Sequence, residues 1–179
     1  KWRDVTIFDG YGYLAGNVNA NDVLNVSGFN AVQSGSVNVK MGMIAGEGDV
    51  GIAGDYFEIR NAADNAWVSL NHSGNSSNNF FNSSIETGGN PRTPDLTNNT
   101  GLDISMFNIN NPNNSIIDNG DTSTSFRFGT TQDTYIIFNI ALAIDAFVPA
   151  TTGELTISSL DGNIGVTPPY SINPGDMST

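Results

Sequence analysis

The sequence predicts an all-β protein, a β-sandwich of jelly-roll or Ig-like type with long Asn/Ser/Gly-rich loops and almost no helix. Apolar and polar residues alternate with a period of two along several segments, which is the pattern of strands with one buried face. Strong helix formers are scarce, whereas Asn and Gly, which favour turns over helix interiors, are frequent. No segment of about ten residues has the apolar spacing of an amphipathic helix.

The clearest strand is expected at residues 36–45. Val37, Val39, Met41 and Met43 occupy alternate positions there and are separated by mostly polar or small residues. Because successive side chains of a strand point to opposite faces, these four are expected to face the core.

The other strands follow in chain order. They are expected at residues 5–8 with a continuation at 11–14, and then at 23–26, 56–60, 67–70, 123–128 and 134–148. Residues 56–60 and 67–70 are spaced to pair as a hairpin around residues 61–65. The segment 134–148 is long enough for two strands, or for one strand with a bulge. Its apolar residues are expected beside those of 36–45: Ile137, Ile140, Leu142 and Ile144.

The alternating pattern stops between residues 71 and 114, where Asn, Ser, Gly and Pro dominate. A structureless loop of this length is uncommon inside a compact domain. We therefore expect short strands or turns around Phe80, Phe81, Ile85 and residues 102–109 to fix this part of the chain.

Two segments are expected from the composition. Residues 1–149 form the sandwich module, and residues 150–179 form a linker followed by the start of another β domain or an exchanged strand. Since the chain begins inside a strand-like run, the module is expected to be the later part of a larger one, completed by a strand from elsewhere. The segments 5–8 and 154–166 are the ones expected to cross between units, because unpaired edges invite strand addition.

The charge balance excludes two classes of partner. Six basic residues stand against 18 acidic ones, for a net charge of −12. Nucleic-acid binding and adsorption to anionic lipids both need clustered Lys and Arg, so neither is expected. No apolar run approaches the roughly 20 residues that span a bilayer, so no membrane insertion is expected either. An acidic surface instead attracts divalent cations.

The absence of cysteine excludes a disulfide framework, a thiol nucleophile and a zinc–thiolate site. His72 is the only histidine and is expected to be exposed on a polar loop. Glu47, Asp49, Asp55 and Glu58 could supply a glycosidase pair, but acidic residues in Gly-rich turns are more often turn formers or cation ligands. The protein is therefore not expected to be an enzyme.

Calcium is the one cofactor that the sequence suggests. Hard cations bind several oxygen atoms on a loop that can wrap around them. Glu47, Asp49 and Asp55 lie among glycines, and Asp118 and Asp121 form a second cluster. Neither cluster has the spacing of an EF-hand, and the alternative is that both are ordinary turns.

A carbohydrate site is the alternative kind of ligand site. Sugar binding uses an aromatic platform with amide or carboxylate groups nearby, often together with calcium. Trp67 and Tyr56 could provide the platform, with Asn71 and Asn75 beside them. This hypothesis describes a calcium-dependent, lectin-like sandwich.

Four stretches of the chain carry a family resemblance. They read VTIFDG at residues 5–10, GEGD to GD at 46–55, NFFNSSI at 79–85, and QDTY to AIDAFVP at 132–149. Together they resemble the N-terminal module of very large bacterial cell-surface proteins, often gliding-motility-associated or type IX-secreted adhesins. In those proteins the module precedes tandem Ig-like repeats, and residues 164–176 resemble the opening of the first repeat.

The resemblance covers residues 1–149 and implies an extracellular role without an active site to carry over. We therefore expect a non-enzymatic structural or adhesion module of a bacterial surface protein or filament. Its partners would be neighbouring domains or subunits of the same surface protein, joined by strand exchange. Glycans would be the partners under the lectin-like alternative.

Overall fold

The computed structural model describes residues 1–150, 157 and 159–164. The chain divides into two compact units, Lys1–Val148 and Pro149–Thr179. In the second unit, β10 (Ser159–Leu160) and β11 (Asn163–Ile164) pair as a short antiparallel hairpin. The rest of the predicted linker and following β segment, at 151–156, 158 and 165–179, lies outside the described residues.

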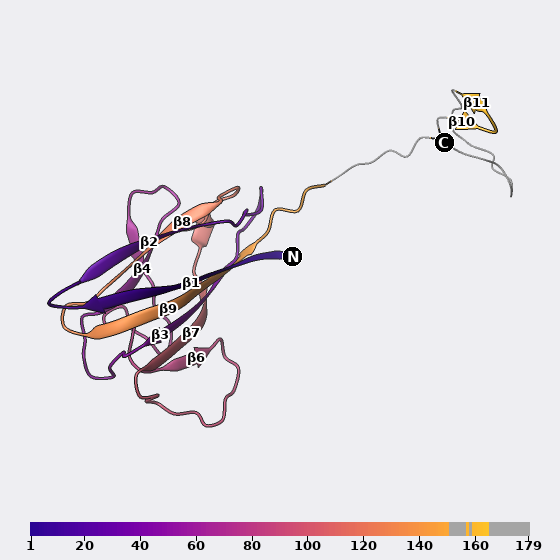
Figure 1. Ribbon diagram of the computed structural model, residues 1–179. Coiled ribbons are helices and arrows are strands. Elements are labelled where there is room, and N and C mark those ends of the chain that lie inside the picture. Colours follow the sequence, from indigo (N-terminus) through magenta and orange to yellow (C-terminus); the bar gives the residue numbers. More distant parts are fainter. Residues whose placement is uncertain (151–156, 158, 165–179) are drawn as a thin grey trace. The chain divides into compact units, whose positions relative to one another are not determined.

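Two sheets form the first unit, and Figure 1 shows them as two layers. The five-stranded sheet has the order β1 (Arg3–Ala15), β9 (Thr134–Asp145), β3 (Val39–Gly46), β7 (Leu102–Ile109) and β6 (Ile85–Thr87). The four-stranded sheet has the order β2 (Asn21–Ser27), β8 (Ser123–Gly129), β4 (Tyr56–Arg60) and β5 (Trp67–Ser69). This confirms the predicted all-β, sandwich-like fold.

Helix is nearly absent from the part of the chain that the structure describes, where it is confined to the short 3-10 element η1 (Pro112–Asn114). None of the described residues belongs to a helix that is long and apolar enough to cross a membrane. The Asn- and Gly-rich composition is thus used in turns, as its propensities predict.

The core lies between the two sheets. The inward side chains of β3 are those that alternation predicts, and each is at most 2% exposed: Val37 just before the strand, then Val39, Met41 and Met43. They pair across the sheet with the predicted neighbours in β9, because Val39 lies opposite Ile144, Met41 opposite Leu142 and Met43 opposite Ile140. The opposite sheet contributes a stack of aromatic rings, Phe57 with Phe126 at 5.3 Å.

The long segment after residue 134 is one strand with a bulge, which is one of the two predicted alternatives. Ile44 of β3 pairs with Asn139, and the next residue, Ala45, pairs with Ile137. Phe138 therefore has no partner in β3, and the residue is 42% exposed. The β1–β9 pairing also shifts register, between Asp9 and Gly12.

The loop-rich region from residue 71 to 114 contains strands at two of the places where short strands or turns were predicted. Residues 102–109 form a full strand, β7, and β6 joins it as a parallel neighbour. Phe80 and Phe81 are completely buried, as predicted for residues that fix this region. A long loop can order in this way because its apolar residues enter the core.

One side of the sandwich remains open. β1 and β2 are end strands of their respective sheets. Residues of both strands, with others from β8 and β9, line a mostly apolar cavity of about 160 Å³, and Phe8 and Leu24 are among them. Phe8 and Leu24 are only partly buried against the core. The two sheets are thus not sealed at this side by the described residues.

Candidate functional site

The predicted calcium loop, residues 47–55, connects β3 to β4, and the structure separates its carboxylates. Glu47 and Asp49 are exposed, whereas Asp55 is completely buried just before β4. Among the described residues, no group of three or more Asp, Glu, His or Cys side chains is arranged to hold a metal ion. The structure therefore does not bring the three predicted ligands together.

The second predicted cluster forms a turn. The backbone N–H of Asp118 donates to Asp121 Oδ2 at 2.7 Å, and the N–H of Asp121 donates to the carbonyl of Asp118 at 3.2 Å. Asn119 N–H donates to Asp118 Oδ1 at 2.7 Å. These contacts match the alternative interpretation, in which short polar side chains stabilise a turn.

Two buried carboxylates hold one loop between the sheets. Asp55 Oδ1 accepts the amide N–H of Phe80 and, at 3.2 Å, that of Phe81. Asp103 Oδ1 accepts the amides of Asn82 at 2.9 Å and Ser84 at 3.1 Å. Asp55 directly precedes β4 in one sheet, and Asp103 lies on the inward face of β7 in the other. Residues 80–84 are thereby attached to both sheets.

A third buried carboxylate lies nearby. Asp133 is 2% exposed and directly precedes β9. Its Oδ1 accepts the amide of Thr134 at 2.7 Å, and its Oδ2 accepts the amide of Asp49 at 3.3 Å. We call Asp55, Asp103 and Asp133 the buried acidic cluster. None of its members forms an ion pair with another described residue.

The electrostatics of the cluster follow from this burial. Burial raises the pKa of Asp55 to about 7; the amides of Phe81 and Phe80 oppose the rise, and the carboxylates of Asp133 and Asp103 add to it. Burial likewise raises the pKa of Asp103 to about 6, against the lowering effect of its amide donors. Burial also raises the pKa of Asp133 above its usual value. The three groups therefore repel one another's charge.

Four buried oxygen atoms in this region have no hydrogen-bond partner: Asp55 Oδ2, Asp103 Oδ2, Asn79 Oδ1 and Asn82 Oδ1. All four are acceptors. Gly48 packs against the same place, because a Cβ on this residue would overlap Asp103 Oδ2 and the carbonyl oxygen of Phe81. The site thus requires glycine at position 48 and presents oxygen atoms that only a donor or a cation can satisfy.

His72 is half-buried, which corrects the prediction of an exposed histidine on a polar loop. Its Nε2 lies 3.0 Å from Ser105 Oγ, and its ring lies 4.9 Å from that of Phe107. Its Nδ1 accepts the amide of Gly74, so the ring proton is placed on Nε2, which then donates to Ser105. A general base would need the opposite tautomer, and Ser105 is completely buried.

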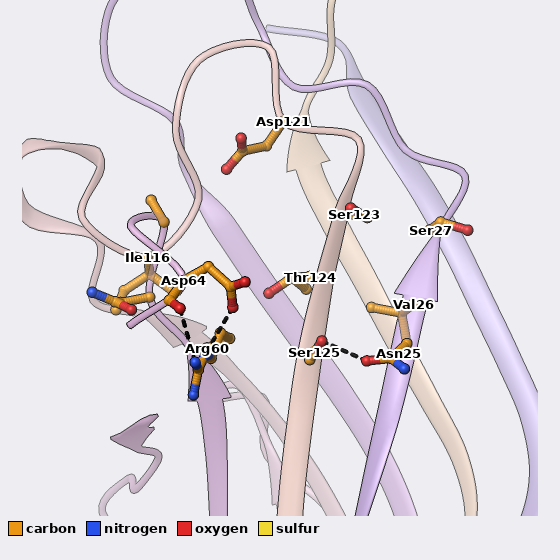
Figure 2. Close-up of a pocket in the computed structure, with 12 residues that line it drawn as sticks. Asn25, Val26, Ser27, Arg60, Asp64, Ile116, Asp121, Ser123, Thr124 and Ser125 are labelled. Carbon is orange, nitrogen blue, oxygen red and sulfur yellow. Dashed lines mark hydrogen bonds and ion pairs between the residues drawn. The ribbon is translucent and has the colours of Figure 1, made fainter. Parts of the chain in front are cut away.

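The largest cavity described lies at one end of the four-stranded sheet and has a volume of about 420 Å³. Figure 2 shows that polar side chains line it, with Arg60 turned toward Asp64 and Asn25 toward Ser125. Arg60 Nε donates to Asp64 Oδ1 at 2.7 Å, and Ser125 Oγ donates to Asn25 Oδ1 at 2.7 Å. Asp121 of the second predicted cluster also lines this cavity. Two pairs of its polar side chains thus bind each other.

The predicted aromatic platform is covered by arginine side chains. The guanidinium carbons of Arg60 and Arg127 each lie 4.9 Å from the ring of Trp67, and Arg127 lies 5.8 Å from the ring of Tyr56. A sugar that stacked on Trp67 would have to compete with these cation–π contacts. Arg127 is also held by Glu58 at 2.6 Å.

The two predicted amide ligands lie in different environments. Asn71 is exposed, whereas Asn75 is 1% exposed. Both ends of the Asn75 amide are used inside the protein, because Nδ2 donates to the carbonyl of Phe80 and Oδ1 accepts from Ser84 Oγ at 2.7 Å. Asn75 therefore has a structural role and is not accessible to a surface ligand.

Sequence reasoning missed Asp103 and Asp133. A signal for Asp103 is present, because it shares one face of residues 102–109 with Ser105, Phe107 and Ile109. An acidic residue on an apolar face indicates a carboxylate with buried partners. Asp133 gives a weaker signal, since it stands at a strand boundary where acidic residues are common.

Comparison with known proteins places no further constraint on this geometry. No protein-family model, no curated protein and no solved structure matches the chain. The function proposed below therefore depends on the sequence and structure of this chain.

Proposed function

We propose that this protein is a non-enzymatic, extracellular structural or adhesion module that joins to a second copy of itself along β1. The single observation that carries this proposal is the unpaired outer edge of β1. Among the described residues, β9 is the only strand that pairs with β1, and the one further bridge joins Ala15 at the end of β1 to Asn19. Val5 and Ile7 on this strand are each 61% exposed. Exposed, unpaired strands of this kind are templates for strand addition.

In residues 3–9 the unpaired backbone groups belong to the odd-numbered residues of this strand. The amide of Ala146 donates to the carbonyl of Trp2, so Trp2 points its backbone toward the β9 side. Backbone direction alternates along an antiparallel strand. The backbone groups of Arg3, Val5, Ile7 and Asp9 therefore point outward.

These outward residues are self-complementary in one antiparallel register. If Thr6 of two copies lie opposite each other, Val5 lies opposite Ile7 of the second copy, and Arg3 lies opposite Asp9. The register thus pairs apolar with apolar and base with acid, and both cross-strand combinations are favourable. Such a dimer is isologous, with each pair occurring twice.

The composition supports the extracellular part of the proposal. A cysteine-free chain with few lysines and a surface of Asn, Ser, Thr and Gly is typical of bacterial surface proteins. The resemblance of residues 1–149 to modules of such proteins supports the same role. We do not choose the lectin-like alternative, because Trp67 and Tyr56 already contact guanidinium groups.

Charge reversal at the strand edge tests the proposal. Sedimentation equilibrium and light scattering of residues 1–179 should show a dimer whose fraction rises with concentration. Arg3→Asp and Asp9→Arg should each weaken the dimer by placing like charges opposite each other. The double variant should restore it, and Asp118→Arg, an equal change of charge in a turn outside β1, is the control. A wild-type protein that stays monomeric at all concentrations, or a double variant without restored dimer, contradicts the proposal.

A further inference from the structure

We propose that the protein binds one hard divalent cation, calcium, between Asp55 and Asp103 at the segment 79–84. This site shares Asp55 with the predicted loop, but Asp103 and the segment 79–84 replace the exposed Glu47 and Asp49 as its other ligands. The inference is independent of the dimer proposed above, since β1 contributes nothing to the site.

The four partnerless oxygens all belong to the segment 79–84 or to the two aspartates whose side chains bind its backbone. Two of them come from Asn79 and Asn82. The other two are the Oδ2 atoms of Asp55 and Asp103. The Oδ1 atoms of these aspartates accept backbone amides of residues 80–84. The carbonyl oxygen of Phe81 is a close neighbour of Asp103 Oδ2, because both contact the same side of Gly48. The segment 79–84 thus supplies two amide oxygens and one carbonyl oxygen, and Asp55 and Asp103 supply two carboxylate oxygens.

The chemistry of these atoms selects a cation. Each partnerless atom is an acceptor, and both aspartates are completely buried. Buried carboxylates require a counter-charge or donors, and the described residues supply no ion pair to either. A divalent cation bound between the two carboxylates would supply the missing counter-charge, and the partnerless amide oxygens of the segment 79–84 are the further ligands that we assign to it.

The ligand types select calcium among common cations. Calcium accepts six to eight oxygen ligands in irregular geometry, including amide and main-chain oxygens. Zinc prefers His and Cys, which are absent from the site, and magnesium demands a near-octahedral arrangement with several waters. Because no three acidic side chains converge here, amide and carbonyl oxygens must complete the coordination. Asp133 adds negative charge nearby without serving as a required ligand.

The site would join the two sheets. Asp55 leads into β4 of the four-stranded sheet, and Asp103 belongs to β7 of the five-stranded sheet. A cation bound by both carboxylates therefore links strands that share no backbone hydrogen bond. Binding only to the folded state must raise the stability of the module.

Calcium titration of the intact chain tests this site. Isothermal titration calorimetry should give one calcium ion per chain, and millimolar calcium should raise the melting temperature above that in chelator, more than equal magnesium does. Terbium should show luminescence sensitised by Tyr135, whose ring stacks on Phe81 at 3.9 Å. Asp103→Asn should weaken calcium binding at least about tenfold.

Further variants keep the test decisive if Asp103→Asn fails to fold. Asn79→Ala and Asn82→Ala remove the amide oxygens and leave both carboxylates, and each should weaken binding. Glu47→Gln and Asp118→Asn, which alter the two predicted loop clusters, should leave affinity unchanged. Identical melting curves in calcium and chelator, with no calorimetric binding, overturn the proposal. So does a result in which Glu47→Gln loses binding while the variants of Asp103, Asn79 and Asn82 keep it.

Discussion

The segment 79–84 and the outer face of the five-stranded sheet depart in opposite directions from the usual distribution of residues. Around the segment, the carboxylates of Asp55, Asp103 and Asp133 are at most 2% exposed. On the outer face, Val5 and Ile7 are more than half exposed. Charge is usually outside and large apolar groups mostly inside, so each region indicates a missing interaction. The carboxylates around the segment lack a counter-charge, and the apolar side chains of the outer face lack a partner that would bury them.

The outer face is apolar across four strands. Ile7, Ala141, Gly42 and Met106 lie side by side, from β1 through β9 and β3 to β7. The small residues in the middle leave a shallow apolar groove of about 170 Å³ beneath Val5 and Met106. Contiguous exposed apolar surface of this kind marks interaction sites.

The two regions differ in energetic scale. An uncompensated buried charge costs several kcal/mol, whereas fully burying one Val or Ile gains about 1.5–3 kcal/mol. The buried acidic cluster is therefore expected to control folding stability. The outer face is expected to control association, where many small gains add up.

The largest expected effect on stability comes from introducing a buried carboxylate at a position without backbone amides to donate hydrogen bonds to it. Val39→Asp puts a charge in the core between β3 and its neighbours, and should lower the free energy of unfolding by on the order of 3 kcal/mol or more. Chemical denaturation measures this loss. An unchanged unfolding midpoint would show that position 39 does not face the core, despite its 2% exposure. Val39→Ala, which leaves a small cavity without a charge, is the matched control.

An intermediate effect is expected from pH in the presence of chelator. The folded state raises the pKa of Asp55 to about 7 and of Asp103 to about 6, from a usual value of 3.8, so it binds protons more tightly than the unfolded state. Stability should therefore fall as pH rises from about 4 to 7, at a limit of about 1.4 kcal/mol per pH unit for each carboxyl. Melting temperatures across this range measure the slope.

Asp55→Asn supplies the comparison for that slope, because it removes one of the titrating groups and should flatten the curve. His72 acts in the opposite direction, since burial lowers its pKa and favours the neutral ring as pH rises. The difference between wild type and Asp55→Asn removes the contribution of His72. Parallel curves for the two proteins would show that Asp55 ionises normally.

The smallest expected effect on stability comes from the outer face. Ile7→Lys changes a side chain that is 61% exposed, so the free energy of unfolding should change by no more than about 0.5 kcal/mol. The same variant should abolish dimer formation, because Lys would lie opposite Val5 of the second copy. Sedimentation and denaturation of one sample separate the two effects. A large loss of stability with an unchanged dimer would reverse the comparison.

Much of the fold could be predicted because its strands carry local periodicity. Residues 37–43 alternate strictly, and their burial follows from that pattern alone. The hairpin of β4 and β5 is also local, with Arg60 opposite Trp67 across a short turn. The bulge in β9 was one of two alternatives, because strand length could not choose between them.

The candidate site was less predictable because it depends on contacts between distant residues. Asp55 binds amides 25 and 26 residues away, and Asp103 binds an amide 21 residues before it. The loop glycines suggested an exposed calcium loop, but Asp55, at the end of that loop next to β4, is buried. Trp67 was predicted as an open platform because the sequence does not show that Arg127 of a different strand reaches its ring.

The pairing of Arg3 with Asp145 has a mechanical consequence. The chain enters the first unit at the same end of the β1–β9 ladder at which it leaves, as Figure 1 shows for these two adjacent strands. Tension applied through both ends would thus load the ladder one rung at a time, starting with the Lys1–Asp145 ion pair at 3.2 Å. Strands that are peeled resist less than strands that are sheared along their length. Within a load-bearing polymer, force would pass through this end of the β1–β9 ladder and bypass the rest of the unit. The residue pairs at this end would therefore separate first, and their separation would lengthen the polymer before the core unfolds.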